Sequence, residues 1–203
     1  NEEARLTYIS ATSEVNHKDP SMVVDIGGGS TEITWGLGSR FDGGRSLKFG
    51  TVKLFEGPLD SKELPSIEQL DLARSEIDTY LKRVTPLGNL NHYYGTAGSF
   101  THLAALDLKL ENYSPDAIHG HRLTKESLDF WIQNLSTMPK EERNLLPGAD
   151  PERGDLLLAG SLIIERLFIK FKNPDFQVVD RGVRYGKLFD MLRGFTPPVQ
   201  FAA

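Results

Sequence analysis

The sequence predicts a single α/β domain in which helices cover a mixed β-sheet. Three observations support this prediction. Three strand-like segments follow one another near the start of the chain, and helical and strand-like segments then alternate to its end. The composition, 39% hydrophobic and 25% charged, is typical of a globular domain with a sizeable core.

The strand-like segments begin at residues 22–26 (MVVDI), which are apolar on both faces and therefore predict a strand in the middle of a sheet. Residues 31–38 (TEITWGLG) alternate in polarity and predict its hairpin partner. A turn at 41–44 (FDGG) is expected to lead into a third strand at 44–49 (GRSLKF). Before them, residues 4–10 predict a helix that continues into a short strand.

Helical periodicity starts at Ser66, which can cap a helix with one apolar face made of Ile67, Leu70, Ala73, Ile77, Tyr80 and Leu81. Pro86 and Gly88 are expected to end this segment. Residues 90–95 (LNHYYG) predict a strand that turns at 95–99 (GTAGS) into the next helix. Thr124 is expected to open a further helix, which Pro139 ends.

The last third of the chain predicts a helix, a strand and a helix. Residues 151–171 are apolar nearly all round, so this helix is expected to be mostly buried. Residues 176–180 (FQVVD) predict a strand that leads into a final helix, and residues 193–203 are expected to form a frayed tail. The predicted order is β-β-β-α-β-α-(α)-α-β-α, in one domain over residues 1–192.

Composition narrows the function classes. The net charge of −5 argues against nucleic-acid binding, and no apolar run is long enough for a membrane span. The chain has no cysteine, which excludes disulfides and thiol chemistry and fits a cytoplasmic protein. It begins NEEARLTY, without methionine or a signal-like segment, so we expect a piece of a longer protein or a processed one.

The most informative stretch is DIGGGSTE, residues 25–32. Its glycines are expected to curl with positive φ, and successive N–H groups in such a turn form an anion site, with Ser30 and Thr31 adding hydroxyl donors. Asp25 and Glu32 would repel a bare phosphate, but they suit a site where Mg²⁺ lies between carboxylate and phosphate, or where one of them activates water. The alternative is a glycine-rich hairpin with two solvated carboxylates.

A second candidate phosphate site is GTAGS, where Gly95, Thr96, Gly98 and Ser99 bring a strand to the start of a helix. The alternative is that Thr96 or Ser99 only caps the helix. The histidines do not form a metal site by their spacing, and Ser30 has no histidine partner nearby in the sequence.

Four basic residues are further candidates for contacting a phosphate chain. Arg181 and Arg184, in VVDRGVRYG, can reach a phosphate chain or equally cover carboxylates of the domain. For Lys48 and Lys53, a solvated position on a strand is the favoured alternative.

The segments NEEARL, VVDIGGGSTEI, FGTVKL, YGTAGSFTHLAAL and VDRGVRYG, in this order, resemble the exopolyphosphatase/guanosine pentaphosphate phosphatase (Ppx/GppA) family. The resemblance covers residues 1–192. It implies a ribonuclease-H-like half-domain of the actin/Hsp70/sugar kinase superfold, the second of the family's two such domains. By this resemblance, the first of the two domains is expected to be absent from this chain.

The resemblance also implies residue roles. Glu3 matches the glutamate taken as general base for the attacking water, and Glu32 matches the second essential glutamate. Asp25, with Glu32, falls on the metal site. Gly27, Gly28, Gly29 and Ser30 fall on the phosphate loop, and GTAGS falls where the far part of the ligand is held.

The expected function is Mg²⁺-dependent release of terminal phosphate from inorganic polyphosphate or pppGpp, with low activity in the chain by itself. Two alternatives stay open: an ATP-dependent phosphotransferase of the same superfold, and a non-catalytic sensor of polyphosphate or alarmone. A homodimer is a further possibility that the sequence leaves undecided.

Overall fold

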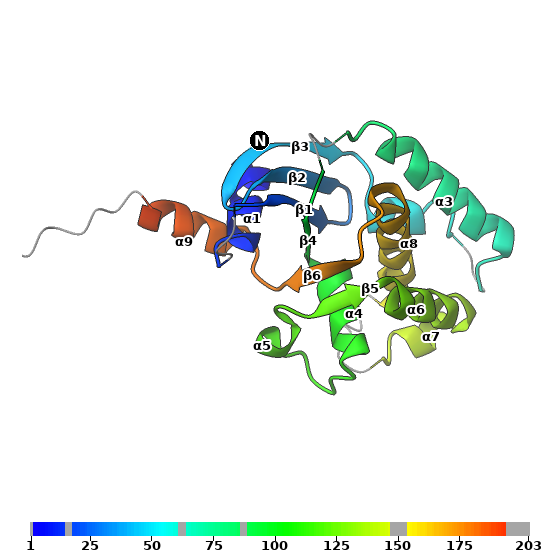
Figure 1. Ribbon diagram of the computed structural model, residues 1–203. Helices are drawn as coiled ribbons and strands as arrows, with labels where there is room; N and C mark the ends of the chain where they lie inside the picture. The colour runs from blue at the N-terminus through cyan, green and yellow to red at the C-terminus, as the bar shows by residue number, and fades with distance from the viewer. Residues whose placement is uncertain (1, 15–17, 61–63, 86–88, 147–153, 194–203) are drawn as a thin grey trace, which may run out of the picture.

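The computed structural model describes residues 2–14, 18–60, 64–85, 89–146 and 154–193. In this part of the chain the centre is a six-stranded sheet with the order β3-β2-β1-β4-β6-β5 (Figure 1). Its strands are β1 (Pro20–Ile26), β2 (Thr31–Leu37), β3 (Arg40–Leu47), β4 (His92–Thr96), β5 (Arg122–Thr124) and β6 (Asp175–Val179). The β1–β4 and β4–β6 pairs are parallel and the other pairs are antiparallel, so the predicted mixed sheet is confirmed.

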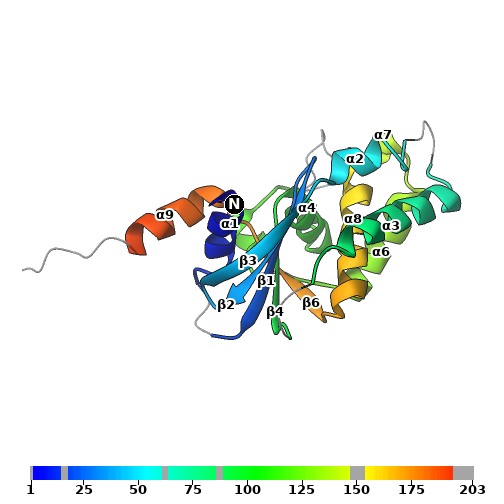
Figure 2. The same cartoon turned by 90° about the horizontal axis from the view of Figure 1, so that it is seen from above.

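Helices lie on both faces of the sheet. On one face are α1 (Glu2–Ala11) and α9 (Val183–Arg193), and Figure 2 shows the larger helical layer on the other face. That layer contains α2 (Thr51–Phe55), α3 (Ile67–Leu81), α4 (Gly98–Asp107), α6 (Lys125–Thr137) and α8 (Gly154–Phe171). The short helices α5 (Pro115–Ile118) and α7 (Lys140–Arg143) lie in the connections. None of the described helices is long and apolar enough to cross a bilayer.

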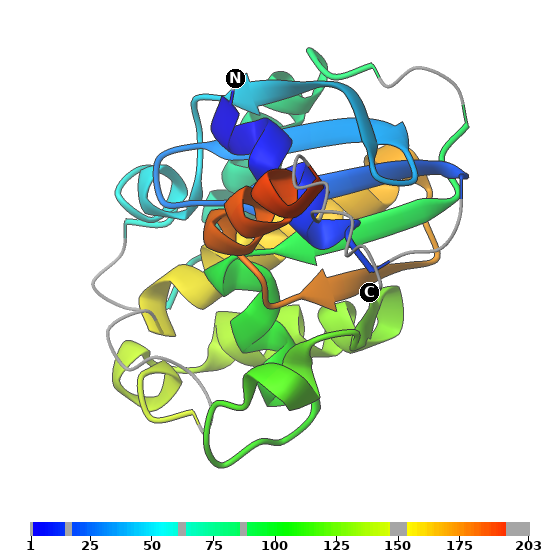
Figure 3. The same ribbon diagram turned by 90° about the vertical axis from the view of Figure 1, so that its left-hand side faces the viewer.

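Helix α1 runs across the sheet next to α9, as Figure 3 shows from that side. It is helical throughout, so the predicted short strand within residues 4–10 was wrong. Tyr8 is fully buried against the sheet, and its hydroxyl donates to the carbonyl of Gly38 over 2.7 Å. The two helices touch at Gly186, where a Cβ would lie 1.9 Å from the carbonyl oxygen of Leu6.

The β2–β3 turn is not where the sequence predicted it. The chain turns at Gly38 and Ser39, with Gly38 at a φ of +53°, and residues 41–44 belong to β3. The glycines of this segment serve packing instead of turning. A Cβ at Gly43 would contact the indole of Trp35, and one at Gly44 would lie 2.7 Å from Cγ2 of Thr34.

Most predicted helices are confirmed. Ser66 caps α3 in a reciprocal capping box with Gln69, and the Thr124 side chain caps α6. The structure adds α2 and the three-residue edge strand β5, which the sequence analysis did not predict. Pro86, Gly88, residues 151–153 and residues 194–203 lie outside the described residues.

Helix α8 is the centre of the helical layer, as its apolar sequence predicted. Leu162, Ile163 and Leu167 are fully buried in the same core as Val24 and Ile33 of the sheet. Helices α2, α3, α4 and α6 all contact α8. This packing fixes α2 and α4 beside the ends of β1 and β4, where the candidate site lies.

Candidate active site

A row of polar side chains crosses the sheet at the end of β1. Asp25 pairs with Glu32 on β2, and Glu32 pairs with Ser46 on β3. Side chains of directly paired residues lie on the same face of a sheet. Val23, two residues before Asp25, packs with Tyr8 of α1. The row therefore lies on the face that α1 covers.

Asp25, in this row, has a raised pKa. Burial is the largest cause, followed by the negative charges of Glu32 and Glu3, and together they raise the pKa of Asp25 to about 6. Glu3 is exposed in the first turn of α1. The structure thus brings together the three carboxylates that the sequence singled out, although 22 positions separate Glu3 from Asp25 in the chain.

Hydrogen bonds hold Glu32 through both of its carboxylate oxygens. The Ser46 hydroxyl donates to Oε1 over 2.6 Å, and the Ser30 hydroxyl donates to Oε2 over 3.2 Å. Asp25, in contrast, makes no side-chain hydrogen bond within the part of the chain that the structure describes. The sequence analysis did not identify Ser46, because only the register of β3 reveals it.

The glycine loop between β1 and β2 is anchored by its carbonyl groups. The carbonyls of Gly27 and Gly28 accept hydrogen bonds from the N–H groups of Thr51 and Val52, over 3.1 and 3.0 Å. This contact requires Gly50 to lack a side chain, because a Cβ there would lie 2.3 Å from the Gly27 carbonyl oxygen.

The three N–H groups of the loop glycines differ in their hydrogen bonding. The Gly27 N–H donates to the Ser30 carbonyl, which closes the hairpin. Among the described residues, the N–H groups of Gly28 and Gly29 have no acceptor, and a Cβ at Gly29 would meet nothing within 4 Å. Two amide donors at an open position can bind an anion.

Two expectations about this loop need correction. Residues 27–29 do not have positive φ, so their glycines are explained by close approach and open space and not by left-handed backbone. Thr31 is fully buried, and its hydroxyl donates to the Phe49 carbonyl over 2.9 Å. Its hydroxyl holds the loop to the segment before α2 and is not available to a phosphate.

The second glycine turn, between β4 and α4, is tightly packed. A Cβ at Gly95 would lie 2.2 Å from the ring of Phe100, so Gly95 serves packing, and Thr96 is buried. Ala97 is the N-cap with a φ of +67°, and no side chain caps the helix. The capping alternative for Thr96 or Ser99 is therefore wrong. Within the described residues, the first N–H groups of α4, on Gly98 and Ser99, have no acceptor.

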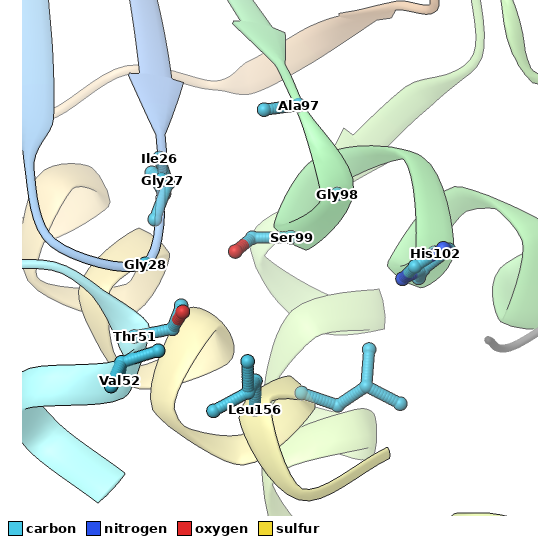
Figure 4. A pocket seen from close by; sticks show the side chains of 11 residues that line it. Ile26, Gly27, Gly28, Thr51, Val52, Ala97, Gly98, Ser99, His102 and Leu156 are labelled. Atoms are coloured by element: carbon cyan, nitrogen blue, oxygen red, sulfur yellow. The ribbon is translucent and has the colours of Figure 1, made fainter. Parts of the chain in front are cut away.

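A cavity of about 350 Å³ lies between the two glycine turns (Figure 4). The hydroxyls of Ser99 and Thr51 both point into it, and these side chains are 8% and 4% exposed. Its lining residues are Ile26, Gly27, Gly28, Thr51, Val52, Ala97, Gly98, Ser99, His102, Leu156 and Leu157. The sequence analysis missed Thr51, which becomes relevant only because α2 packs beside the loop.

Two of the four basic candidates have partners in the domain, and the other two are exposed. Arg181 forms an ion pair with Glu14 and lies over the Tyr185 ring, which matches the alternative that it covers a carboxylate of the domain. Arg184 and Lys48 are exposed. Lys53 lies on α2, not on a strand, and lines a hollow with Gly28 and Gly29, while its amine donates to the Tyr80 hydroxyl.

The carboxylates of this site can supply some, but not all, of the ligands that Mg²⁺ requires. Among the described residues, no group of three acidic or histidine side chains is placed to hold a metal alone. Asp25 and Glu32 offer carboxylate oxygens on paired strands. Mg²⁺ is commonly held by one or two carboxylates with water and substrate phosphates as the other ligands, so two carboxylates beside an anion-binding loop suit it.

Comparison with known proteins gives a family match over nearly the whole chain. Residues 1–195 match the Ppx/GppA phosphatase family. Over 170 residues the chain is 33% identical to exopolyphosphatase 2 of Mycobacterium tuberculosis, covering 82% of this chain and 53% of that protein. It is 31% identical over 172 residues to a bifunctional 3-dehydroquinate synthase/phosphatase of Fusobacterium nucleatum, covering 81% of this chain and 25% of that protein.

Solved structures show the same architecture. The crystal structure of the Aquifex aeolicus Ppx/GppA family member matches with a TM-score of 0.89 and 28% identity, covering 96% of this chain and 63% of that one. The predicted ribonuclease-H-like, actin-like fold is thereby confirmed. The chain spans about half the length of the exopolyphosphatase that it matches. From the family match and these similarities, we conclude that the chain belongs to the Ppx/GppA phosphatase family.

Proposed function

We propose that the protein containing this chain is a hydrolase that releases terminal phosphate from inorganic polyphosphate or from a nucleotide such as pppGpp. The observation that carries this proposal is that Glu3 and Glu32 lie close enough to Asp25 to raise its pKa, next to a loop whose Gly28 and Gly29 amides have no acceptor among the described residues. A loop of free amide donors binds phosphate, and an adjacent carboxylate can activate water.

In this mechanism the amides of Gly28 and Gly29 hold oxygens of the terminal phosphate. Glu3 takes a proton from the water that attacks phosphorus in line with the bridging oxygen, and the phosphoanhydride bond breaks with its electron pair on that oxygen. Glu32, fixed by two serine hydroxyls, keeps its carboxylate oriented towards the reacting groups. A bound Mg²⁺, held by Asp25 and Glu32, would offset the negative charge of the phosphates.

The cavity beside the loop would hold the next part of the substrate. Its lining includes Gly98 and Ser99, whose N–H groups lie at the positive end of α4 and have no acceptor among the described residues. The Thr51 and Ser99 hydroxyls offer further hydrogen bonds. This placement supports a phosphate chain that extends from the glycine loop towards α4.

The relatives are longer than this chain, so its own activity is a separate question. We propose that residues 1–192 act together with a further domain that supplies additional donors to the phosphate. The chain by itself is then expected to release phosphate weakly or not at all.

The test is phosphate release from long-chain polyphosphate with Mg²⁺, measured with the complete protein and its Glu3→Gln variant. We expect the variant to lose about 100-fold or more in rate, because general-base catalysis contributes on that order. Glu2→Gln is the matched control, since Glu2 lies in the same exposed turn and its contact is an ion pair with Arg5.

Three outcomes would contradict the proposal. Equal rates in Glu3→Gln and wild type would remove the assigned base. ATP-dependent phosphorylation of an acceptor without phosphate release would favour a phosphotransferase. Tight binding of polyphosphate without release would favour a sensor.

A further inference from the structure

Ser46 lies on β3, the edge strand of the sheet, and its role follows from strand register. It is directly paired with Glu32, and Glu32 is directly paired with Asp25. The Cβ atoms of directly paired residues lie about 5 Å apart, so the short serine side chain can reach the end of a glutamate on the next strand. The observed contact from Ser46 Oγ to Glu32 Oε1 is 2.6 Å.

We propose that Ser46 is a positioning residue that fixes the carboxylate of Glu32 for phosphate release. This inference rests on the proposed function. A glutamate side chain has three rotatable bonds, and its terminal torsion is broad, so the carboxylate plane is poorly defined by rotamer preference alone. One hydrogen bond to each oxygen removes this freedom. Ser30 supplies the bond to Oε2 from the glycine loop, and Ser46 supplies the bond to Oε1 from β3.

The two serines are not equivalent. Ser30 is part of the loop that would hold phosphate, so its substitution would change both binding and orientation. Ser46 lies outside the loop and does not line the cavity between the two turns. Its hydroxyl has one described partner, Glu32. Loss of this hydroxyl is therefore expected to change turnover and leave substrate binding nearly unchanged.

The size of the effect follows from exposure. Ser46 is exposed at the sheet edge, so in an alanine variant water can occupy the position of the lost hydroxyl and bind Oε1. A hydrogen bond to a charged group is nevertheless stronger than a neutral one. We expect Ser46→Ala to lower kcat about tenfold, with KM within about twofold of wild type.

The test is the Mg²⁺-dependent release of phosphate from polyphosphate by the complete protein, with kcat and KM determined separately. Ser46→Thr keeps a hydroxyl at the same Cβ and is expected to retain most of the wild-type kcat. Ser75→Ala, an exposed serine on α3, is the matched control and is expected to behave as wild type. Thermal unfolding of each variant checks that the fold is intact.

Each outcome decides the inference. A tenfold fall of kcat in Ser46→Ala that Ser46→Thr reverses supports it. It is overturned if Ser46→Ala keeps its kcat, if KM rises in place of a fall in kcat, or if the threonine variant is as slow as the alanine variant. A wild-type protein that releases no phosphate would overturn the proposed function, and the positioning role with it.

Discussion

The two glycine turns of this domain look alike in sequence but differ in what their glycines do. In the β1–β2 loop, a Cβ at Gly29 would point into open space, and the amides of Gly28 and Gly29 have no acceptor among the described residues. In the β4–α4 turn, a Cβ at Gly95 would lie 2.2 Å from the ring of Phe100, and a Cβ at Gly160 of α8 would lie 2.6 Å from the Ser99 hydroxyl oxygen.

The surroundings of the turns differ in charge as well. The first turn lies between Asp25 and Glu32, with the charge of Glu3 near enough to act on Asp25. The second is followed by the buried Ser99 and an apolar helix. The comparison indicates that the first turn leaves space and amide donors for a ligand, whereas Gly95 in the second turn permits close packing of α4 on the sheet.

The largest change in the free energy of unfolding is expected for Gly95→Ala. The added Cβ would lie 2.2 Å from the Phe100 ring, which is fully buried and contacts Phe176. Forcing a methyl group into a packed core costs about 3 kcal/mol, so we expect the free energy of unfolding to fall by about that amount. Urea denaturation of the purified chain measures it. A loss below about 0.5 kcal/mol would show that the second turn is not packed as described.

The second effect concerns Asp25 and depends on pH. Its pKa is raised from 3.8 to about 6 in the folded chain, so the folded state binds the proton more tightly than the unfolded state. The free energy of unfolding therefore falls as the pH rises from about 4 to about 6, because the folded chain must give up a proton that it holds more tightly than the unfolded chain does. Above about pH 6 this contribution no longer changes. Asp25→Asn is therefore expected to stabilise the chain by about 2 kcal/mol at pH 8 and to have little effect at pH 3.5.

Denaturant unfolding of wild type and Asp25→Asn at both pH values measures this difference. Equal stability of the two proteins at pH 8 would mean that the Asp25 charge is not penalised by burial and by its neighbouring carboxylates. Asn at this position keeps the shape of the side chain, so packing is not altered by the change.

The smallest effect on stability is expected for Gly29→Ala, the counterpart of the first prediction. The φ of Gly29 is not positive and its Cβ position is open, so the free energy of unfolding should change by less than about 0.5 kcal/mol. In the proposed mechanism, however, the methyl group would stand where phosphate approaches the loop. Phosphate release by the complete protein should fall while stability is kept, and a large loss of stability would contradict the open loop.

The sequence predicted the fold well where local rules dominate. The apolar β1, the alternating β2 and the cap at Ser66 are local signals, and the structure confirms them. The prediction of a turn at residues 41–44 was wrong. Two glycines are a common turn signal, and only the position of Trp35 on the neighbouring strand explains why glycines occur here. The strand β5 has three residues, too few for a pattern to appear.

The candidate site was predictable where a side chain follows a strand in sequence, as Asp25 and the glycine loop do. The approach of Glu3 to Asp25 depends on how α1 crosses the sheet, and the sequence pointed to it only through the family resemblance. Ser46 depends on the register of β3, and the burial of Thr31 depends on the Phe49 carbonyl. These are tertiary contacts that no local pattern contains.

The most direct test of the central claim is the phosphate release rate of a Glu32→Gln variant of the complete protein, with Glu56→Gln as an exposed control. Both variants should unfold within about 1 kcal/mol of wild type. We predict that Glu32→Gln lowers the rate of release from polyphosphate about 100-fold or more, while Glu56→Gln leaves it unchanged. Release by Glu32→Gln within about threefold of wild type would contradict the assignment of the carboxylate row as the catalytic site.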